Sequence, residues 1–398
     1  MPDSIPTSDL QAFKDQLLNP NTEIENAGGQ ERKIMKVQKN FVLSLVSDST
    51  GCGHIRNVFP LTYMNSQFGK TGKFNLIMTP VAILQKDILT RTRSIFFQRN
   101  MSPAHVSLVR HYKEMQKTLK FKMVYDIDDF IWEGPDEGER IPEYNFGHRG
   151  ITEEVRKANV EIMNMMDVVC VSTEFLKQYL KNNLKIQPDV VVVPNAVPQF
   201  FWGPDKKVGI RKRLERPKVI YTGSPTHYNN ETRLLGDWQN AWLEWVVRNV
   251  RQNKIDFTCM GGLPFFFEEI KEKIKIIPWV NSYQYHLPIK VAKPDFGIAP
   301  LVPNYFNYSK SHIKYQEYCA LGIVGLGTVF TNGKPSPYDV CQVKVPDNVT
   351  SQQIDQIFWP LCEPEKYNSI LQTQYQQMEA GGWWLESPQY IKLLMSIF

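Results

Sequence analysis

The chain has 398 residues, of which 42% are hydrophobic and 22% charged, and a formal net charge of +5. This is the composition of a globular protein long enough for two domains. No apolar run approaches the roughly 20 residues that span a bilayer, and the N-terminus has neither the basic region nor the apolar core of a signal peptide, so we expect a cytoplasmic protein without a transmembrane segment. The six cysteines stand far apart without a Cys-x-x-Cys pair, which argues against a disulfide framework or a zinc site.

Positive charge is concentrated in one part of the chain. Residues 31–122 contain 16 Lys and Arg against 4 Asp and Glu, a difference of +12, so the total of +5 leaves −7 for the remainder. Such an asymmetry predicts a polyanionic partner for this segment, either nucleic acid or an anionic surface. Ordinary solvated lysines on the surface are the alternative.

The N-terminal half alternates short apolar runs with helical stretches. A lead-in over residues 1–30, with one short helix at 8–18, precedes a buried strand at 41–46 and a loop that leads into a helix ending near residue 64. The further strands that we expect lie at 74–78, 94–97, 123–127, 168–172 and 190–193, and the helices between them at 103–119, 152–166 and 173–181. Because several of these strands are continuously apolar, they predict a parallel sheet that is covered on both faces.

The loop after the first strand contains Gly51 and Gly53, which allow a ligand to approach the main chain. His54 and Arg56 stand beside the start of the next helix. A strand, a glycine-containing loop and a helix form the opening unit of a doubly wound α/β domain, whose ligands bind beyond the carboxyl ends of the strands. Two glycines alone are a weak signal and by themselves favour a simple tight turn.

An acidic cluster, Asp126-Ile-Asp-Asp129, stands at the end of the strand expected at 123–127. In a strand Asp126 and Asp128 share a face, and repulsion between neighbouring carboxylates raises the pKa of one of them, which suits a catalytic base. Metal binding by this Asp-x-Asp pattern and a structural role, as a helix cap or a partner of Arg and Lys, are the alternatives.

A charged stretch over residues 199–217 is the predicted domain linker. A second α/β series follows, with strands expected at 218–223, 255–260, 274–277, 295–299 and 323–328, and a helical segment over 366–398 that is a candidate to pack back on the N-terminal domain. Ser224 and His227 follow the first of these strands, where a nucleotide-binding loop is expected. Gly262 marks a second loop that a ligand can approach closely.

The segment from Pro300 to Gly322 passes through a polar loop into a helix. Lys310, Lys314 and Glu317 recur there at three- and four-residue spacing, so they share one face. Together with Ser311 they crowd the start of a helix, where unpaired N–H groups already attract anions. This arrangement suits a nucleotide diphosphate, although a solvated helix with an ordinary Lys–Glu pair would show the same spacing.

Several motifs together resemble the GT-B glycosyltransferases of the family-4-like group. The C-terminal half contributes Tyr221-Thr-Gly-Ser-Pro-Thr-His227, Asp295-Phe-Gly-Ile-Ala-Pro-Leu301 and the run from Phe306 to Gly322; the N-terminal half contributes Val124-Tyr-Asp-Ile-Asp-Asp129, Val169-Cys-Val-Ser-Thr-Glu174 and Val192-Val-Pro-Asn-Ala-Val197. The resemblance covers residues 40–330 in the right order. It implies an α/β fold of two Rossmann-like, doubly wound domains that face each other across a cleft, one at 31–198 for the acceptor and one at 218–365 for the nucleotide sugar.

The resemblance also implies roles for single residues. Gly223 and Ser224 would lie near the diphosphate of a UDP-sugar, while Lys310, Ser311 and Lys314 would neutralise it. Glu317 would accept hydrogen bonds from ribose hydroxyls. The chain departs from the family pattern at Ser309, eight residues before Glu317, where many members have another Glu that touches the sugar.

The leaving group in such a family is a nucleoside diphosphate, which two lysines and a helix start can stabilise without a required metal, so assistance by a divalent ion stays an open alternative. Asp128 or Asp129, with His54 as a rival, would then orient or deprotonate the acceptor hydroxyl.

We expect the acceptor to be double-stranded DNA, because phosphate neutralisation rewards a basic domain. Aromatic residues stand between the cations at 96–100 and 110–113 and suit the stacking of an extruded base. The pattern is similar to the bacteriophage enzymes that attach arabinose or glucose to 5-hydroxymethylcytosine in DNA. The acceptor-binding residues that we predict are Gly53, Arg56, Arg91, Arg93, Arg99 and Asp126.

Two other functions are compatible with the same sequence. A transferase for surface polysaccharide or lipid-linked glycan would share the donor site but bind a membrane-linked acceptor. A non-catalytic protein that binds DNA or nucleotide sugars would keep the basic face and transfer nothing.

Overall fold

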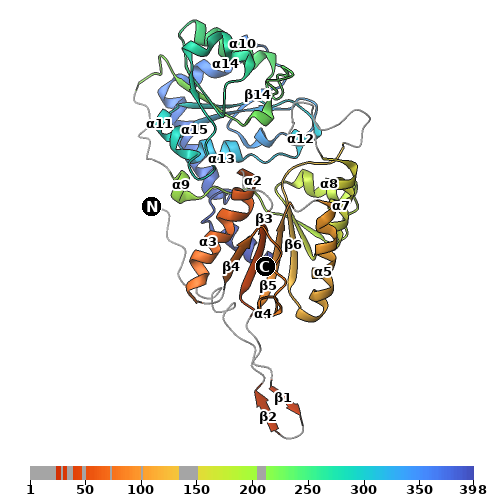
Figure 1. The fold of residues 1–398 in the computed structure, drawn as a ribbon. Coiled ribbons are helices and arrows are strands. Elements are labelled where there is room, and N and C mark those ends of the chain that lie inside the picture. The colour runs from red at the N-terminus through yellow and green to blue at the C-terminus, as the bar shows by residue number, and fades with distance from the viewer. Residues whose placement is uncertain are drawn as a thin grey trace.

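The computed structural model describes residues 24–27, 30–33, 39–46, 51–71, 74–99, 102–133, 151–203 and 212–398. The helix expected at 8–18, the first part of the loop after the first strand (47–50) and Asn100 lie outside these residues. Two parallel six-stranded sheets dominate the fold, and each carries helices on both faces (Figure 1). A two-stranded antiparallel hairpin of β1 (Ile24–Ala27) and β2 (Gln30–Lys33) precedes them.

The N-terminal sheet has the strand order β4-β3-β5-β6-β7-β8. Its strands are β3 (Phe41–Val46), β4 (Asn75–Thr79), β5 (Thr92–Gln98), β6 (Lys122–Ile127), β7 (Val168–Val171) and β8 (Asp189–Val192). Successive side chains point to opposite faces, so Leu43 packs with the helices of one face and Val42 with those of the other. The order reverses between β3 and β5, which is where a doubly wound sheet opens a crevice beyond its carboxyl edge.

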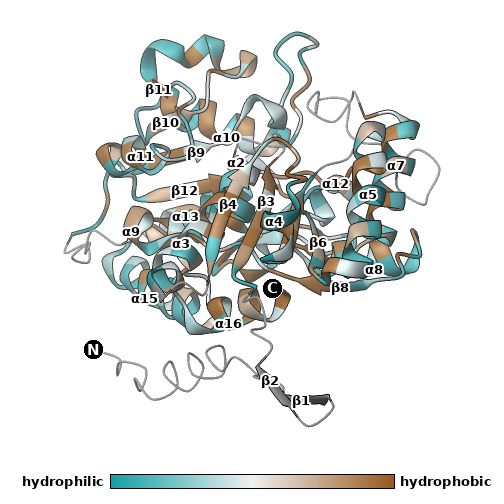
Figure 2. Ribbon diagram, turned by 60° about the horizontal axis from the view of Figure 1, so that its bottom comes forward, coloured by the Kyte–Doolittle hydropathy of each residue, from teal (hydrophilic) through white to brown (hydrophobic). Residues whose placement is uncertain are grey.

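The C-terminal sheet has the order β11-β10-β9-β12-β13-β14, so its crevice opens between β9 and β12. Its strands are β9 (Lys218–Thr222), β10 (Asp256–Met260), β11 (Lys275–Ile277), β12 (Phe296–Ala299), β13 (Val324–Val329) and β14 (Val343–Pro346). Figure 2 shows β3 and β12 in mostly hydrophobic colours, as expected for strands that are covered on both faces.

Fourteen α-helical segments of the described residues flank the sheets and line the space between them. They are α2 (Gly51–Gly53), α3 (Phe59–Phe68), α4 (Lys86–Thr90), α5 (Pro103–Leu119), α7 (Glu153–Asn164), α8 (Glu174–Asn182), α9 (Gln199–Trp202), α10 (Asn240–Arg251), α11 (His286–Ala292), α12 (Tyr305–Tyr308), α13 (Ile313–Ala320), α14 (Ser351–Phe358), α15 (Pro364–Ala380) and α16 (Pro388–Ile397). None of the helices in the described part of the chain has the length and apolar character needed to cross a bilayer.

The chain passes between the two domains twice. It first crosses through α9, and it returns after α15, where Val197 forms a parallel bridge to Trp384. Helix α16 then packs on the N-terminal sheet: Leu394 and Phe398 belong to the same buried cluster as Phe96 of β5. The mark for the C-terminus in Figure 1 accordingly lies beside the N-terminal sheet.

The α/β class and the two doubly wound domains that the sequence predicts are confirmed by this architecture. The expected strand at 74–78 shifts by one residue to Asn75–Thr79, and the expected strand at 94–97 extends back to Thr92. The reading of the chain as regularly alternating strands and helices therefore holds, with small errors at the boundaries.

Candidate functional site

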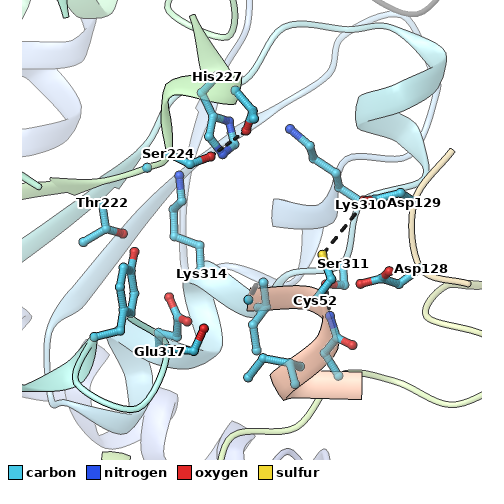
Figure 3. A pocket seen from close by; sticks show the side chains of 18 of the residues that line it. Cys52, Asp128, Asp129, Thr222, Ser224, His227, Lys310, Ser311, Lys314 and Glu317 are labelled. Carbon is cyan, nitrogen blue, oxygen red and sulfur yellow. Dashed lines mark hydrogen bonds between the residues drawn. The ribbon is translucent and has the colours of Figure 1, made fainter. Parts of the chain in front are cut away.

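A cavity of about 300 Å³ lies between the two domains, beyond the carboxyl edges of both sheets. The N-terminal domain contributes Gly51 and Cys52 at the start of α2 and the Asp128–Asp129 pair after β6. The C-terminal domain contributes the loop after β9 and the segment that leads into α13. Figure 3 shows the side chains of the two domains facing each other across this space.

The loop after β9, residues 223–227, forms one wall of the cavity, and a close backbone contact fixes it. The N–H of Gly223 donates to the Met260 oxygen at 3.0 Å. Gly261 has φ of +108°, and a Cβ there would lie 2.0 Å from the Gly223 oxygen. Only glycine fits this position, because both the conformation and the space exclude a side chain. Gly262, a predicted donor-binding residue, has φ of +123° but is not among the residues that line the cavity.

His227 and Lys310 share a buried partner, Asp237, which the sequence did not suggest. One carboxylate oxygen of Asp237 lies 2.6 Å from His227 Nδ1 and 3.2 Å from Lys310 Nζ, and the other accepts from Asn307 Nδ2 at 2.7 Å. The Asp237 side chain is 1% exposed. Burial, together with the charges of Lys310 and Lys314, lowers the pKa of His227 to about 4, although Asp237 acts in the opposite direction. The ring is therefore neutral at neutral pH.

Lys314 lies one turn after Lys310 and has no carboxylate partner among the described residues. Its Nζ rests 4.8 Å from the centroid of the Tyr221 ring. Burial, with a smaller contribution from Lys310, lowers the pKa of this ammonium to about 8, although Asp237 and Glu317 act in the opposite direction. The two lysines therefore present a concentrated positive charge to the cavity, which an anion would relieve.

Glu317 lies one turn further along α13 and also lines the cavity. Burial raises the pKa of its carboxyl group to about 8, against the pull of Lys314. Ser309, where the family pattern often has a Glu, is 1% exposed and donates its hydroxyl to the Phe306 oxygen at 2.8 Å. It is not among the cavity-lining residues, and its hydroxyl is engaged by the main chain.

Ser311 joins the donor side of the cavity to the N-terminal domain. Its hydroxyl accepts from Asn195 Nδ2 at 2.7 Å, and Asn195 in turn accepts from Arg56 at 3.0 Å. Arg56 also donates through two nitrogens to Asp126, at 3.1 and 2.5 Å. We predicted Arg56 and Asp126 to bind the acceptor, but their side chains are 1% and 2% exposed and bind each other. A buried bidentate pair has no free face for a ligand. The pair instead supports the domain interface, because Arg56 also holds Asn195, which donates to Ser311.

Asp128 and Asp129 face the cavity from the N-terminal domain, together with Cys52. Burial, together with the charge of Asp129, raises the pKa of Asp128 to about 7, although Arg99 and Arg56 act in the opposite direction. Oδ1 of Asp128 is buried without a hydrogen-bond partner. Asp129 is held by Arg99 Nη1 at 3.0 Å. Asp128 thus has the properties of a general base near neutral pH.

The same corner is a place where a metal ion could be held. Ligand atoms of Cys52, Asp128 and Asp129 lie within 4.8 Å of one another. A thiolate with two carboxylates suits zinc-like ions better than magnesium, which prefers oxygen ligands only. The Arg99 guanidinium already neutralises Asp129, so a cation would have to compete with it.

Two predicted N-terminal residues do not reach the cavity. The His54 ring packs edge-on against Tyr283, with centroids 4.7 Å apart, and near Phe59 at 5.5 Å. Gly53 is buried within α2. Neither is among the residues that line the cavity, so Asp128 is better placed than His54 to meet an acceptor.

Arg91 and Arg93, predicted to bind the acceptor, lie at the opposite edge of the N-terminal sheet. They flank the start of β5, whereas the cavity lies beyond the ends of the strands. Arg91 rests 4.7 Å from the centroid of the Phe41 ring, and Arg93 Nε donates to the Phe398 oxygen at 2.9 Å. The structure therefore does not bring these two residues to the cavity, because parallel strands begin at one edge of the sheet and end at the other. Arg99, at the end of β5, lies beside the cavity.

Comparisons with known proteins place the fold. No protein-family model matches the chain, and no curated protein matches its sequence. Sucrose-phosphate synthase from Thermosynechococcus elongatus superposes with a TM-score of 0.56 at 10% identity and covers 90% of this chain and 98% of its own. HepE from Anabaena, solved in complex with UDP, superposes with a TM-score of 0.55 at 9% identity and covers 91% and 100%.

The fold is GT-B. The GT-B match extends over nearly the full length of both solved structures, so both domains and their facing arrangement are shared. At identities of 9–10% the similarity concerns the fold alone, and the chemistry of the GT-B cavity must be argued from the residues of this chain.

Sequence reasoning missed two residues of the site. Asp237 stands in a loop between β9 and α10, and its partners come from residues 10, 70 and 73 positions away. Asn195 appeared only within the motif Val192-Val-Pro-Asn-Ala-Val197 and without a role, although it connects Arg56 to Ser311. What distinguishes both residues is that they are polar and buried in loops. The sequence does not show this, because the burial of a loop residue is known only from the structure.

Proposed function

We propose that the protein is a glycosyltransferase that transfers a sugar from a UDP-sugar to a hydroxyl group. The observation that carries the proposal is the pair of cavity-lining ammonium groups, Lys310 and Lys314, of which Lys314 has no carboxylate partner among the described residues. A diphosphate leaving group supplies the missing negative charge, and fixed cations stabilise it as the bond to the sugar breaks. The HepE structures with UDP and UDP-glucose support this class of donor.

The nucleotide would bind to the C-terminal domain. Gly223 and Ser224 line the cavity where the main chain can approach the diphosphate, with Ser311 on the other side. The Glu317 carboxyl would meet the ribose hydroxyls. No step of this scheme requires a metal, since the lysines provide the positive charge.

Asp128 would act on the acceptor. Its carboxyl group belongs to the cavity lining, as do Lys310 and Lys314, so it can take the proton of an incoming hydroxyl while Asp129 stays bound to Arg99. The pKa of about 7 places the base near half ionisation at neutral pH, a condition that favours proton transfer.

For the acceptor we propose a 5-hydroxymethylcytosine-type base in DNA. The support is the excess of 12 positive charges over residues 31–122 and the half-exposed Trp279 in the cavity wall, on which an extruded base can stack. The placement of Arg91 and Arg93 away from the cavity counts against the part of this argument that rested on them.

A surface glycan is the second candidate acceptor. Trp279, Tyr283 and Phe200 are 50%, 47% and 62% exposed, and Tyr283 and Trp279 belong to the segment between β11 and α11 that borders the cavity. Exposed aromatic rings offer apolar faces on which a sugar ring can pack.

The test is to incubate the protein with UDP-glucose, UDP-arabinose and other UDP-sugars and with three acceptors: hydroxymethylated DNA, unmodified DNA and lipid-linked glycan. Mass spectrometry of the nucleosides and glycans identifies the product, and UDP release gives the rate. A sugar on hydroxymethylcytosine supports the DNA proposal. A sugar only on glycan replaces it with the second candidate, and UDP-sugar binding without transfer to any acceptor would refute the transferase.

A further inference from the structure

The His227 side chain lines the cavity, and its neighbours determine which of its ring nitrogens carries the proton. Its Nδ1 lies 2.6 Å from a carboxylate oxygen of Asp237. An ionised carboxylate only accepts hydrogen bonds, so Nδ1 must carry the proton. The pKa of about 4 keeps the ring neutral at neutral pH, which leaves Nε2 with a lone pair and no proton.

Asp237 is held firmly enough to impose this state. Lys310 donates to the same oxygen that His227 uses, and Asn307 donates to the other one at 2.7 Å. These contacts and a side chain that is only 1% exposed hold the carboxylate in place against His227 Nδ1. Nε2 of His227 has no hydrogen-bond partner among the described residues, and the ring lines the cavity.

The ligand group that meets Nε2 must be a donor. The oxygens of an ionised diphosphate have lone pairs only, so they would repel Nε2 rather than bind it. A hydroxyl group is the donor that a UDP-sugar offers there. This inference rests on the proposed function.

The hydroxyl belongs to the sugar rather than to the ribose. In Figure 3 Lys314 lies between Glu317 on one side and His227 on the other. Lys314 acts on the pKa values of both groups, in agreement with this order. In a UDP-sugar the diphosphate stands between ribose and sugar in the same way, so a ribose at Glu317 and a diphosphate at the lysines bring the sugar to His227.

We infer that His227 accepts a hydrogen bond through Nε2 from a hydroxyl group of the sugar being transferred, and that Asp237 is the positioning residue that fixes the ring for this contact. The pair selects donors by the presence and position of one hydroxyl. It supplies the sugar contact that Ser309, buried and bonded to the main chain, does not make.

Binding measurements separate this contact from nucleotide binding. Calorimetric titrations of the full-length protein use UDP, UDP-glucose and UDP-arabinose, and then the deoxyfluoro analogues of the tighter UDP-sugar, in which fluorine replaces one donating hydroxyl at a time. His227→Phe should weaken the UDP-sugar by about 3- to 10-fold, the range of one hydrogen bond, and leave UDP unchanged. One fluoro analogue should lose the same factor in wild type and none in His227→Phe, and His227→Gln, which keeps an acceptor oxygen, should recover part of the affinity.

The protonation state has its own readout. With ¹⁵N-labelled histidine, His227 should show protonated Nδ1 and bare Nε2 at pH 7, as should His312, whose Nε2 faces the donating Gln316 amide. The His227 signal is the one that should vanish in His227→Gln and move to the Nε2-protonated form in Asp237→Asn, while the His312 signal stays.

The inference is overturned if His227→Phe weakens UDP and the UDP-sugar equally, if no single hydroxyl accounts for the loss, or if Nε2 is protonated in the wild type. Wild-type protein that binds none of these nucleotides would instead refute the proposed function. The two failures are therefore distinguishable.

Discussion

Lys314 provides a measurable conflict between stability and binding. Its pKa falls from 10.5 to about 8 in the folded protein. At about 1.36 kcal/mol for each unit, the charged side chain costs about 3 kcal/mol of folding free energy in the ligand-free state. The contact with the Tyr221 ring, worth about 1 kcal/mol, is lost with the charge, so Lys314→Met should stabilise the free protein by about 2 kcal/mol.

The same substitution should weaken UDP. Hydrogen bonds to charged groups contribute about 1.5–3 kcal/mol, so the dissociation constant should rise about 10- to 100-fold. Calorimetry measures the affinity, and thermal unfolding of the free protein measures the gain in stability. Lys366→Met, which removes an exposed lysine from α15 in the same domain, is the matched control and should change neither quantity much.

The loss of folding free energy caused by the Lys314 charge should depend on pH. Because the folded pKa is below the unfolded value, the penalty is complete below about pH 8 and disappears as pH rises towards 10.5. The stability difference between Lys314→Met and wild type should therefore shrink from about 2 kcal/mol at pH 7 to about 1.4 kcal/mol at pH 9.5, one unit below the unfolded pKa of 10.5, and approach zero only above that pKa. A variant that is less stable than wild type at pH 7 and binds UDP normally would refute the argument.

Three further substitutions test other parts of the site. Asp128→Asn should abolish transfer while UDP affinity stays within about twofold, and the wild-type rate should fall as pH drops below about 7, because only the ionised carboxylate acts as a base. Gly261→Ala should cost about 1–3 kcal/mol of stability and lower the affinity for UDP, because its Cβ would displace the loop after β9. The control is Gly333→Ala, which is also at positive φ but in open space. It should show the backbone cost without the loss of UDP affinity. Arg56→Met should destabilise the protein by about 3–5 kcal/mol in chemical denaturation, because it leaves Asp126 buried without its partner, and a cost below 1 kcal/mol would contradict this.

The fold was largely predictable because the signals for it are local. Runs such as residues 41–46 and 218–222 are short, apolar and bounded by loops, so they identify buried parallel strands without knowledge of their neighbours. The spacing of Lys310, Lys314 and Glu317 likewise follows from one helical period. These three residues line the cavity together.

The rest of the site depends on contacts between distant residues. Arg56 and Asp126 were predicted to bind an acceptor because they stand near the ligand-binding ends of predicted strands, but the two residues, 70 positions apart, bind each other and are buried when the domain folds. Asp237 carries no motif, and only its partners reveal its role. Arg91 lies away from the cavity for a topological reason, because the charge of a stretch of sequence does not indicate at which edge of a sheet its residues lie.

Helix α16 has a consequence for synthesis in the cell. Leu385, Tyr390 and Leu394 fill the same cluster as Val42 and Phe96, so one layer of the N-terminal domain is made from residues translated after the whole C-terminal domain. During synthesis the N-terminal domain therefore leaves the ribosome with one apolar face uncovered, and this face is covered only when residues 385–398 emerge. We expect nascent chains halted before residue 385 to recruit chaperones and to be degraded by proteases that spare the finished protein.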